Sequence, residues 1–315
     1  MWKKGVNGNM AHIDLEKYND QIKFERTAHF ATPFDLAYEA FVDLGYDRCD
    51  SSFFTENASV FIEKMRRQCW DVFVPHEKEF TTRMLRYLID YKKISRMSPA
   101  DAIEDFVMEY PEHIYKLALS NTQSRRSRAG KEFEAILELL LIGADIPADT
   151  QGSVGKQTFS RNGLGKLVDF VSPGVVQYVR NKRNTTLISA KTTLRERWQE
   201  VPEEVTRTGT REMYLATLDE GITEETRTVL YEANVILATT KGNKTKNYPA
   251  DQRIVTFEEL IAIAAEAANK WNAYRYSAED IAGMKRYLQA QVSKHENHPY
   301  VKNYYQRRIN ELSEN

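Results

Sequence analysis

Two short apolar runs, Leu167–Val171 and Thr186–Ala190, have the length and composition of β-strands, and each is marked by one charged residue. Asp169 lies in the middle of the first run, where a carboxylate is costly unless it has a partner or a task. Lys191 directly follows the second run. If the two runs pair as neighbouring strands, the carboxylate and the ammonium group meet at one point of a sheet. Taken singly, a solvated edge-strand acid and a surface lysine remain the alternatives.

A carboxylate and a lysine on neighbouring strands suit metal-dependent hydrolysis of a phosphodiester. Mg²⁺ prefers hard oxygen ligands, usually one or two carboxylates with phosphate and water. Lys191 would orient or deprotonate the attacking water or stabilise the charged phosphorane. Many such sites carry a second acid two positions before the lysine, where this chain has Ser189. Glu204 and Glu134 are the candidates for that second carboxylate.

The triplet Arg195-Glu196-Arg197 comes four residues after the lysine. Arginine donates two hydrogen bonds to guanine O6 and N7, and a carboxylate accepts from cytosine N4. Three such residues in succession can therefore address two adjacent G·C pairs beside the cut bond. The alternative is a charged helix start with internal ion pairs.

The charge distribution fits a protein that binds a polyanion in one place. The net charge is only −1, which argues against a general polycation. Basic residues nevertheless crowd the stretch from Tyr178 to Arg197, and Arg125-Arg126-Ser127-Arg128 forms a second cluster. Localised basic segments allow the protein to bind one polyanion in a cleft. The alternative is that solvated surface charges cluster there by chance.

Composition predicts a soluble cytoplasmic protein. Hydrophobic residues make up 42% and charged residues 28% of the chain, as in globular proteins. The longest apolar runs fall short of the roughly 18 residues of a membrane span, and the N-terminus has no signal-peptide pattern. Cys49 and Cys69 fit neither a zinc nor a disulfide pattern.

Hydrophobic spacing predicts a mainly helical region over residues 1–120 and an α/β region over residues 121–315. Helices are expected at 35–44, 56–73, 78–91, from Ser98 onward, and at 130–141. Strands are expected at 167–171, 186–190, 213–218 and 235–238, separated by helices at 224–232 and 257–271, with a polar helical end over 277–312. Strands that alternate with helices predict a mixed central sheet flanked by helices.

These residues together resemble type II restriction endonucleases of the PD-(D/E)XK superfamily. The resemblance rests on Asp169, Ser189-Ala190-Lys191, Arg195-Glu196-Arg197 and Glu204, with Arg128–Glu134 upstream. The branch is the one that contains EcoRII, PspGI, NgoMIV and SsoII, and the SsoII-type group that recognises 5′-CCNGG is the most similar. Val168 stands where the superfamily has its proline and Ser189 where it has its acid, and both departures are typical of this branch.

The resemblance implies a role for each of these residues. Asp169 and Glu204 would bind Mg²⁺, Glu134 would support the site, and Lys191 would be the catalytic lysine. Arg195, Glu196 and Arg197 would read C·G pairs in double-stranded DNA. A homodimer on a palindromic site is also implied, with room for further association on DNA, and with a cognate cytosine methyltransferase that acts on the same site.

Members of this branch can extrude the central base pair, so that an interrupted site fits a reader built for CCGG. By resemblance, Trp70 and Arg66 would sandwich the extruded base, and Gln123 would lie in the minor groove beside the vacated position. Extrusion of this kind requires a stacking surface. Packing in a core is the alternative for Trp70, because apolar residues accompany it at helical spacing.

Two other functions remain open from the sequence. One is a repair or junction-resolving nuclease of the same superfamily, which would cut by DNA structure. The other is a DNA-binding protein that keeps the fold without activity. The Arg-Glu-Arg triplet beside the lysine argues against the first, and the presence of all three active-site residue types argues against the second.

Overall fold

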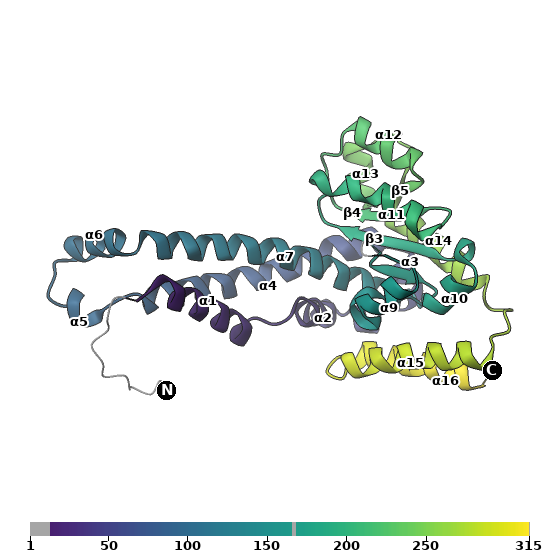
Figure 1. Ribbon diagram of the computed structural model, residues 1–315, viewed down its shortest axis with the longest axis horizontal. Coiled ribbons are helices and arrows are strands. Elements are labelled where there is room, and N and C mark those ends of the chain that lie inside the picture. Colours follow the sequence, from purple (N-terminus) through teal and green to yellow (C-terminus); the bar gives the residue numbers. More distant parts are fainter. Residues whose placement is uncertain (1–12, 166–167, 315) are drawn as a thin grey trace. The chain divides into compact units, whose positions relative to one another are not determined.

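The computed structural model describes residues 13–165 and 168–314, without the side chains of residues 195–197, 204 and 314. The chain forms two compact units, each assembled from separate stretches. The first contains residues up to Thr32 and Cys69–Arg128, and the second contains Pro33–Gln68 and Ala129–Asn315. Two long helices, α4 (Ala58–Tyr87) and α7 (Pro111–Gly143), each contribute to both units (Figure 1). A functional division near residue 120 stays a prediction.

The first unit is helical. It contains α1 (Leu15–His29), α5 (Tyr91–Ile94), α6 (Pro99–Glu109) and parts of α4 and α7. Its core is an apolar cluster of Tyr18, Ile22, Phe80, Met84, Leu88, Tyr110 and Leu117. The sequence predicts two helices where α4 is one, because Pro75 is a helix breaker in an average context. Pro75 is solvent-exposed, and buried residues continue at helical spacing on the opposite face.

The second unit contains a mixed sheet, which has six strands within the described residues. They are β1 (Asp149–Thr150), β2 (Phe170–Ser172), β3 (Thr186–Lys191), β4 (Met213–Thr217), β5 (Val235–Thr239) and β6 (Ile254–Thr256), in spatial order 1 to 6. The pairs β1–β2 and β2–β3 are antiparallel, and β3 to β6 run parallel. The predicted mixed sheet with flanking helices is thereby confirmed.

Most of the described helices belong to this second unit. They are α2 (Pro33–Asp43), α3 (Ser51–Glu56), α8 (Gln151–Val154), α9 (Lys156–Arg161), α10 (Val175–Arg180), α11 (Val201–Thr208), α12 (Glu224–Glu232), α13 (Lys241–Asn247), α14 (Phe257–Asn269), α15 (Ala278–Lys294) and α16 (Pro299–Glu314), with 3₁₀ turns η1 (Tyr46–Arg48), η2 (Lys182–Asn184) and η3 (Arg195–Glu200). Among the described residues, no helix combines the length and apolar character needed to cross a membrane.

Successive side chains along each strand point to opposite faces of the sheet, and apolar side chains are buried on both faces. Leu187, Leu215 and Leu237 belong to one buried cluster, together with side chains of the helices that flank it. Their neighbours in sequence, such as Ile188 and Ala216, are buried on the opposite face. There α14 packs against β2, β3 and β5, and its Phe257 ring lies 6.3 Å from the ring of Phe133 on α7.

Short elements account for the differences from the sequence prediction. The strands β1 and β6 have two and three residues, too few for an alternating pattern to be recognised. Leu167, the predicted start of a strand, lies outside the described residues, and β2 begins at Phe170. The polar C-terminal segment forms two helices, α15 and α16, because the chain reverses at His295–His298 (Figure 1).

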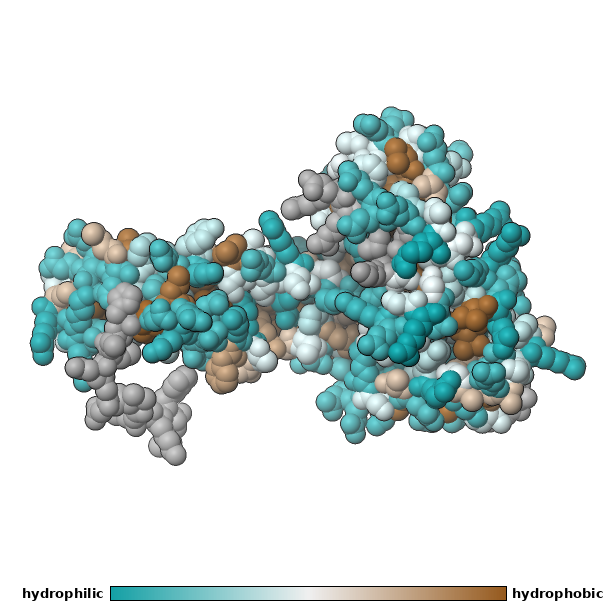
Figure 2. All heavy atoms as spheres, in the orientation of Figure 1, coloured by the Kyte–Doolittle hydropathy of each residue, from teal (hydrophilic) through white to brown (hydrophobic). Residues whose placement is uncertain are grey.

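The surface drawn in Figure 2 is mostly hydrophilic, with separate hydrophobic spots. The most exposed large apolar side chains lie in the helical unit, with Met108 at 74% and Ile103 at 69% exposure, both on α6. No residue of α6 is buried, so this helix adds little to the apolar core.

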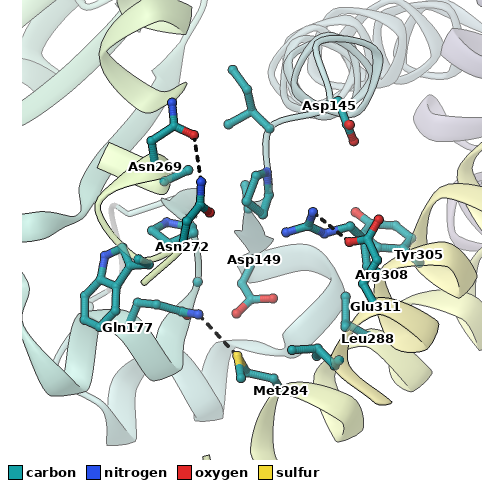
Figure 3. A pocket seen from close by; sticks show the side chains of 18 of the residues that line it. Asp145, Asp149, Gln177, Asn269, Asn272, Met284, Leu288, Tyr305, Arg308 and Glu311 are labelled. Carbon is teal, nitrogen blue, oxygen red and sulfur yellow. Dashed lines mark hydrogen bonds and ion pairs between the residues drawn. The ribbon is translucent and has the colours of Figure 1, made fainter. Parts of the chain in front are cut away.

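A cavity of about 540 Å³ in the second unit contains a buried carboxylate, that of Asp149 (Figure 3). Its oxygens accept hydrogen bonds from the Val175 amide at 2.8 Å and from Gln291 Nε2 at 3.3 Å. Burial raises the pKa of Asp149 to about 6, partly opposed by the Val175 bond. The Gln291 Oε1 atom is buried without a hydrogen-bond partner, which suits a protonated acid nearby.

We expect Asp149→Asn to stabilise the protein at pH 8 and to have a much smaller effect at pH 4. A raised pKa means that the fold favours the protonated acid, so this stability is complete below about pH 4 and is lost as the pH rises through about 6. A rise of about two units in the pKa of this carboxyl group corresponds to roughly 3 kcal/mol in the free energy of unfolding. Urea unfolding of both proteins at pH 4, 5, 6 and 8 measures the difference in the free energy of unfolding. A difference that does not grow between pH 4 and pH 6 would contradict the expectation.

Candidate active site

The pairing of β2 with β3 brings Asp169 and Lys191 together. Antiparallel pairing aligns Phe170 with Ile188, and the Asp169 amide donates to the Ile188 carbonyl at 2.9 Å. Asp169 therefore lies opposite the last residues of β3. Its Oδ2 atom accepts from the Ala190 amide at 2.7 Å and from Lys191 Nζ at 3.1 Å. The two residues that the sequence singles out are in direct contact.

Glu134 supplies a second carboxylate from α7. Lys131 Nζ contacts both of its oxygens, at 2.9 and 2.6 Å. Burial raises the pKa of Glu134, and the negative charge of Asp169 raises it further, while Lys131 and Lys191 oppose the rise. The charge of Asp169 thus acts on Glu134 in the direction expected for two carboxylates in one site.

This arrangement fits a divalent cation. Two carboxylates that repel each other become compatible when a cation lies between them, and both offer the hard oxygen atoms that Mg²⁺ binds. In the part of the chain that the structure describes, no group of three acidic, histidine or cysteine side chains forms a complete metal site. Mg²⁺ often binds to only one or two carboxylates, and further ligands come from substrate phosphate and water.

Ser189 is not a substitute for the missing acid. Its side chain is fully buried, and its Oγ atom has no hydrogen-bond partner. The side chain of Glu204, the other candidate, lies outside the described residues, although its backbone belongs to α11. The neighbouring Glu203 is exposed.

The predicted readout triplet begins four residues after the end of β3. Arg195, Glu196 and Arg197 form the start of η3, and their side chains lie outside the described residues. The chain just before them is held in place, because the amide of Leu194 donates to Asp219 Oδ2 at 2.8 Å. Asp219 follows β4 and is absent from the sequence prediction. The only sequence signal for it is its place directly after a strand that runs parallel to β3.

Trp70 and Gln123 lie in the helical unit. Trp70 on α4 is 49% exposed, so it is not a core residue. The Arg125 guanidinium lies 5.5 Å from the centre of its ring and also bonds Glu77 at 2.8 Å. Gln123 is exposed on α7.

Arg66 belongs to the second unit, although it precedes Trp70 by one helical turn of α4. It lines a cavity of about 520 Å³. Polar residues form most of that wall: Glu63, Glu220, Thr240, Asn243, Lys246 and Asn247.

Several of the clustered basic residues have structural partners, so a count of charges in the sequence overstates the positive charge that is available to bind an anion. Arg180 pairs with Asp280 at 2.8 Å, and Lys182 donates to the Thr208 carbonyl at 2.6 Å. Arg128 donates to the Ala31 carbonyl at 2.9 Å. The second basic cluster lies inside α7 rather than before a helix. Sequence counts of charge do not separate such paired arginines from free ones.

Comparison with known proteins gives consistent matches. The family described as EcoRII C terminal matches residues 91–261, a little over half of the chain. The type II restriction enzyme SsoII of Shigella sonnei is 57% identical over 303 residues, which cover 96% of this chain and 99% of that protein.

Solved structures agree with this match. The metal-depleted Ecl18kI complex with uncleaved, modified DNA has a TM-score of 0.90 and 56% identity, over 95% of this chain and 99% of that chain. The complex of the restriction endonuclease PspGI with substrate DNA has a TM-score of 0.57 and 18% identity, over 82% of this chain and 98% of that one, which shows a shared fold.

The contact between Asp169 and Lys191 thus occurs in a chain with close restriction-enzyme relatives. A nuclease that cuts by DNA structure and a non-catalytic binding protein, the two alternatives left open by the sequence, are set aside. The chain belongs to the EcoRII C-terminal family and is a type II restriction endonuclease.

Proposed function

We propose that this enzyme hydrolyses double-stranded DNA in a Mg²⁺-dependent reaction at a short palindromic G·C-rich site, 5′-CCNGG, and leaves 5′-phosphate ends. The observation that carries the proposal is the contact of Asp169 Oδ2 with Lys191 Nζ at 3.1 Å. The high identity to SsoII over nearly the whole chain supports a site of the SsoII type.

The residues divide the chemistry between them. Asp169 and Glu204 would hold the Mg²⁺ ion, which, when bound, neutralises phosphate charge and makes water more acidic. Glu134 would support that site through its proximity to Asp169. Lys191 carries a positive charge 3.1 Å from Asp169, where it can orient the attacking water and stabilise the charge that develops on the phosphorane.

Sequence readout would follow from the start of η3. Arg195 and Arg197 would each donate two hydrogen bonds to a guanine, and Glu196 would accept from cytosine N4. Gln123 would contact the minor groove near the centre of the site. A palindromic site is best matched by two copies of the chain related by twofold symmetry, so we propose a homodimer that can associate further on DNA.

An interrupted site requires that the central pair leave the stack. Trp70 exposes half of its surface and would stack on the extruded base, with the planar cation of Arg66 on the other side of that base. Stacking of a base on an aromatic ring contributes about 1–3 kcal/mol, which offsets much of the unstacking cost.

A cytoplasmic enzyme of this kind would act beside a cognate cytosine methyltransferase that protects host sites.

Lys191→Ala and Asp169→Ala should each lower the Mg²⁺-dependent cleavage rate at least about 100-fold, because charge stabilisation at the phosphorane is lost. Glu204→Ala should be comparably inactive, and Glu203→Ala, which removes the adjacent exposed acid, is the matched control. Single-turnover cleavage measures the rates. Normal cutting by Lys191→Ala would refute its assignment, and normal cutting by Glu204→Ala would move the second acid to Glu203 or Glu134.

Arg195→Ala and Arg197→Ala should each reduce discrimination by roughly 1–3 kcal/mol at one G·C position. Competition binding in Ca²⁺ between a cognate duplex and duplexes with single substitutions gives this quantity without cleavage. Arg126→Ala, which changes an exposed arginine of α7, is the control. Equal losses on cognate and random DNA would identify the triplet as a backbone clamp.

A 2-aminopurine at the central position should change its fluorescence when the enzyme binds, because the base leaves the duplex. Trp70→Ala should make the complex brighter than the wild-type complex, since quenching by the stacked ring is lost. Trp70→Phe keeps an aromatic face and should restore part of the quenching. An unchanged signal at saturation, confirmed by a mobility shift, would mean that the central base stays stacked.

A further inference from the structure

The parallel strands β3, β4 and β5 end at one edge of the sheet, and three loops meet there. Lys191, the last residue of β3, pairs in register with Thr217, the last residue of β4. Asp219 follows two residues later, and its amide donates to Thr217 Oγ1 at 3.2 Å. The carboxylate of Asp219 therefore lies beside the chain that leaves β3.

Both oxygens of Asp219 accept backbone hydrogen bonds. Oδ1 accepts from the Gly221 amide at 3.0 Å, which closes a local turn. Oδ2 accepts from the amide of Leu194, in the loop that follows β3, at 2.8 Å. Leu194 is 2% exposed, precedes Arg195 directly, and offers no side-chain cap to η3. The acceptor that orders the start of η3 thus comes from the loop after the neighbouring strand β4.

The loop that carries Asp219 is fixed from its other side as well. The Asp219 carbonyl accepts from Asn243 Nδ2 at 3.0 Å and from the Tyr248 hydroxyl at 2.8 Å. Asn243 also donates to Thr239 Oγ1 at 2.8 Å, at the end of β5. Leu218 and Asn243 line the same cavity as Arg66. One short loop therefore contacts the start of η3 and forms a wall of that cavity.

We infer that Asp219 is a specificity-determining positioning residue, which sets the place of the Arg195-Glu196-Arg197 triplet through the Leu194 amide. The inference rests on the proposed readout of G·C pairs by this triplet. Paired hydrogen bonds to a base edge require correct donor placement to a fraction of an ångström. The hydrogen bond from the Leu194 amide to Asp219 Oδ2 is a constraint of this kind, and it is independent of any contact with DNA.

The test compares Asp219→Ala with Asp219→Asn. Both variants lose the negative charge and at least one of the two acceptor oxygens, so both disturb the Gly221 turn. Asparagine retains an oxygen that can accept from Leu194, and alanine retains none. The measured quantity is the ratio of Kd values in Ca²⁺ for the mapped cognate duplex and for duplexes with one G·C pair replaced. Thermal unfolding and active-site titration give the folded and active fractions.

Asp219→Ala should reduce this ratio about tenfold, as expected when a hydrogen bond to a charged acceptor is lost. Asp219→Asn should stay within about threefold of the wild type. The single-turnover rate of Asp219→Ala on saturating cognate DNA should change much less than its discrimination, because Asp169 and Lys191 are untouched. A residue with only a structural role would reduce the active fraction and leave the ratio unchanged.

The outcomes separate this inference from the proposed function. A wild-type ratio near one would overturn the proposed readout, and the inference with it. A high wild-type ratio that Asp219→Ala leaves unchanged would overturn the inference alone. Equal losses in Asp219→Ala and Asp219→Asn would assign the effect to charge or to the local turn, and would likewise overturn it.

Discussion

The antiparallel pairing of β2 with β3 is the constraint on which the active site depends. One register places Asp169 beside Ala190 and Lys191, and a shift by one residue would move the carboxylate to the other face of the sheet. The backbone bond from Ala190 to Asp169 Oδ2 fixes the carboxylate, so Lys191 meets an acid that is already oriented. The buried side chains beneath these strands, including Val171 and Leu187, stabilise that register.

The parallel half of the sheet concentrates other functions at the same edge. Lys191 is the last residue of β3 and η3 follows it. Asp219 lies just after β4, and Asn243 lies just after β5. Parallel strands with helical connections place all their carboxyl ends together, which is where open α/β sheets usually bind ligands. The topology thus places the proposed catalytic residues and the proposed readout triplet near each other, and hydrogen bonds connect the loops that carry them.

Sequence reasoning could predict that Asp169 and Lys191 meet, because a charged residue in an apolar run needs a physical reason. It could also predict the main strands and Glu134, which lies on a long apolar helix. It could not find β1 or β6, whose lengths are below any recognisable period, or the buried Asp149, whose surroundings come from distant segments. Asp219 was equally hidden, since its partner Leu194 is 25 residues away and the bond uses a backbone amide. The exposure of Trp70 likewise needed the structure, because helical spacing alone favours packing.

The proposed function has two parts: metal-dependent chemistry at one strand pair, and its direction to one DNA sequence by the adjacent segment. Digestion of a plasmid of known sequence with Mg²⁺, followed by sequencing of the fragment ends, tests both parts together. The account predicts that all ends fall within one palindromic G·C-rich sequence, carry 5′-phosphates, and disappear when Mg²⁺ is chelated. Ends spread over unrelated sequences, or the same cutting without a divalent cation, would contradict it.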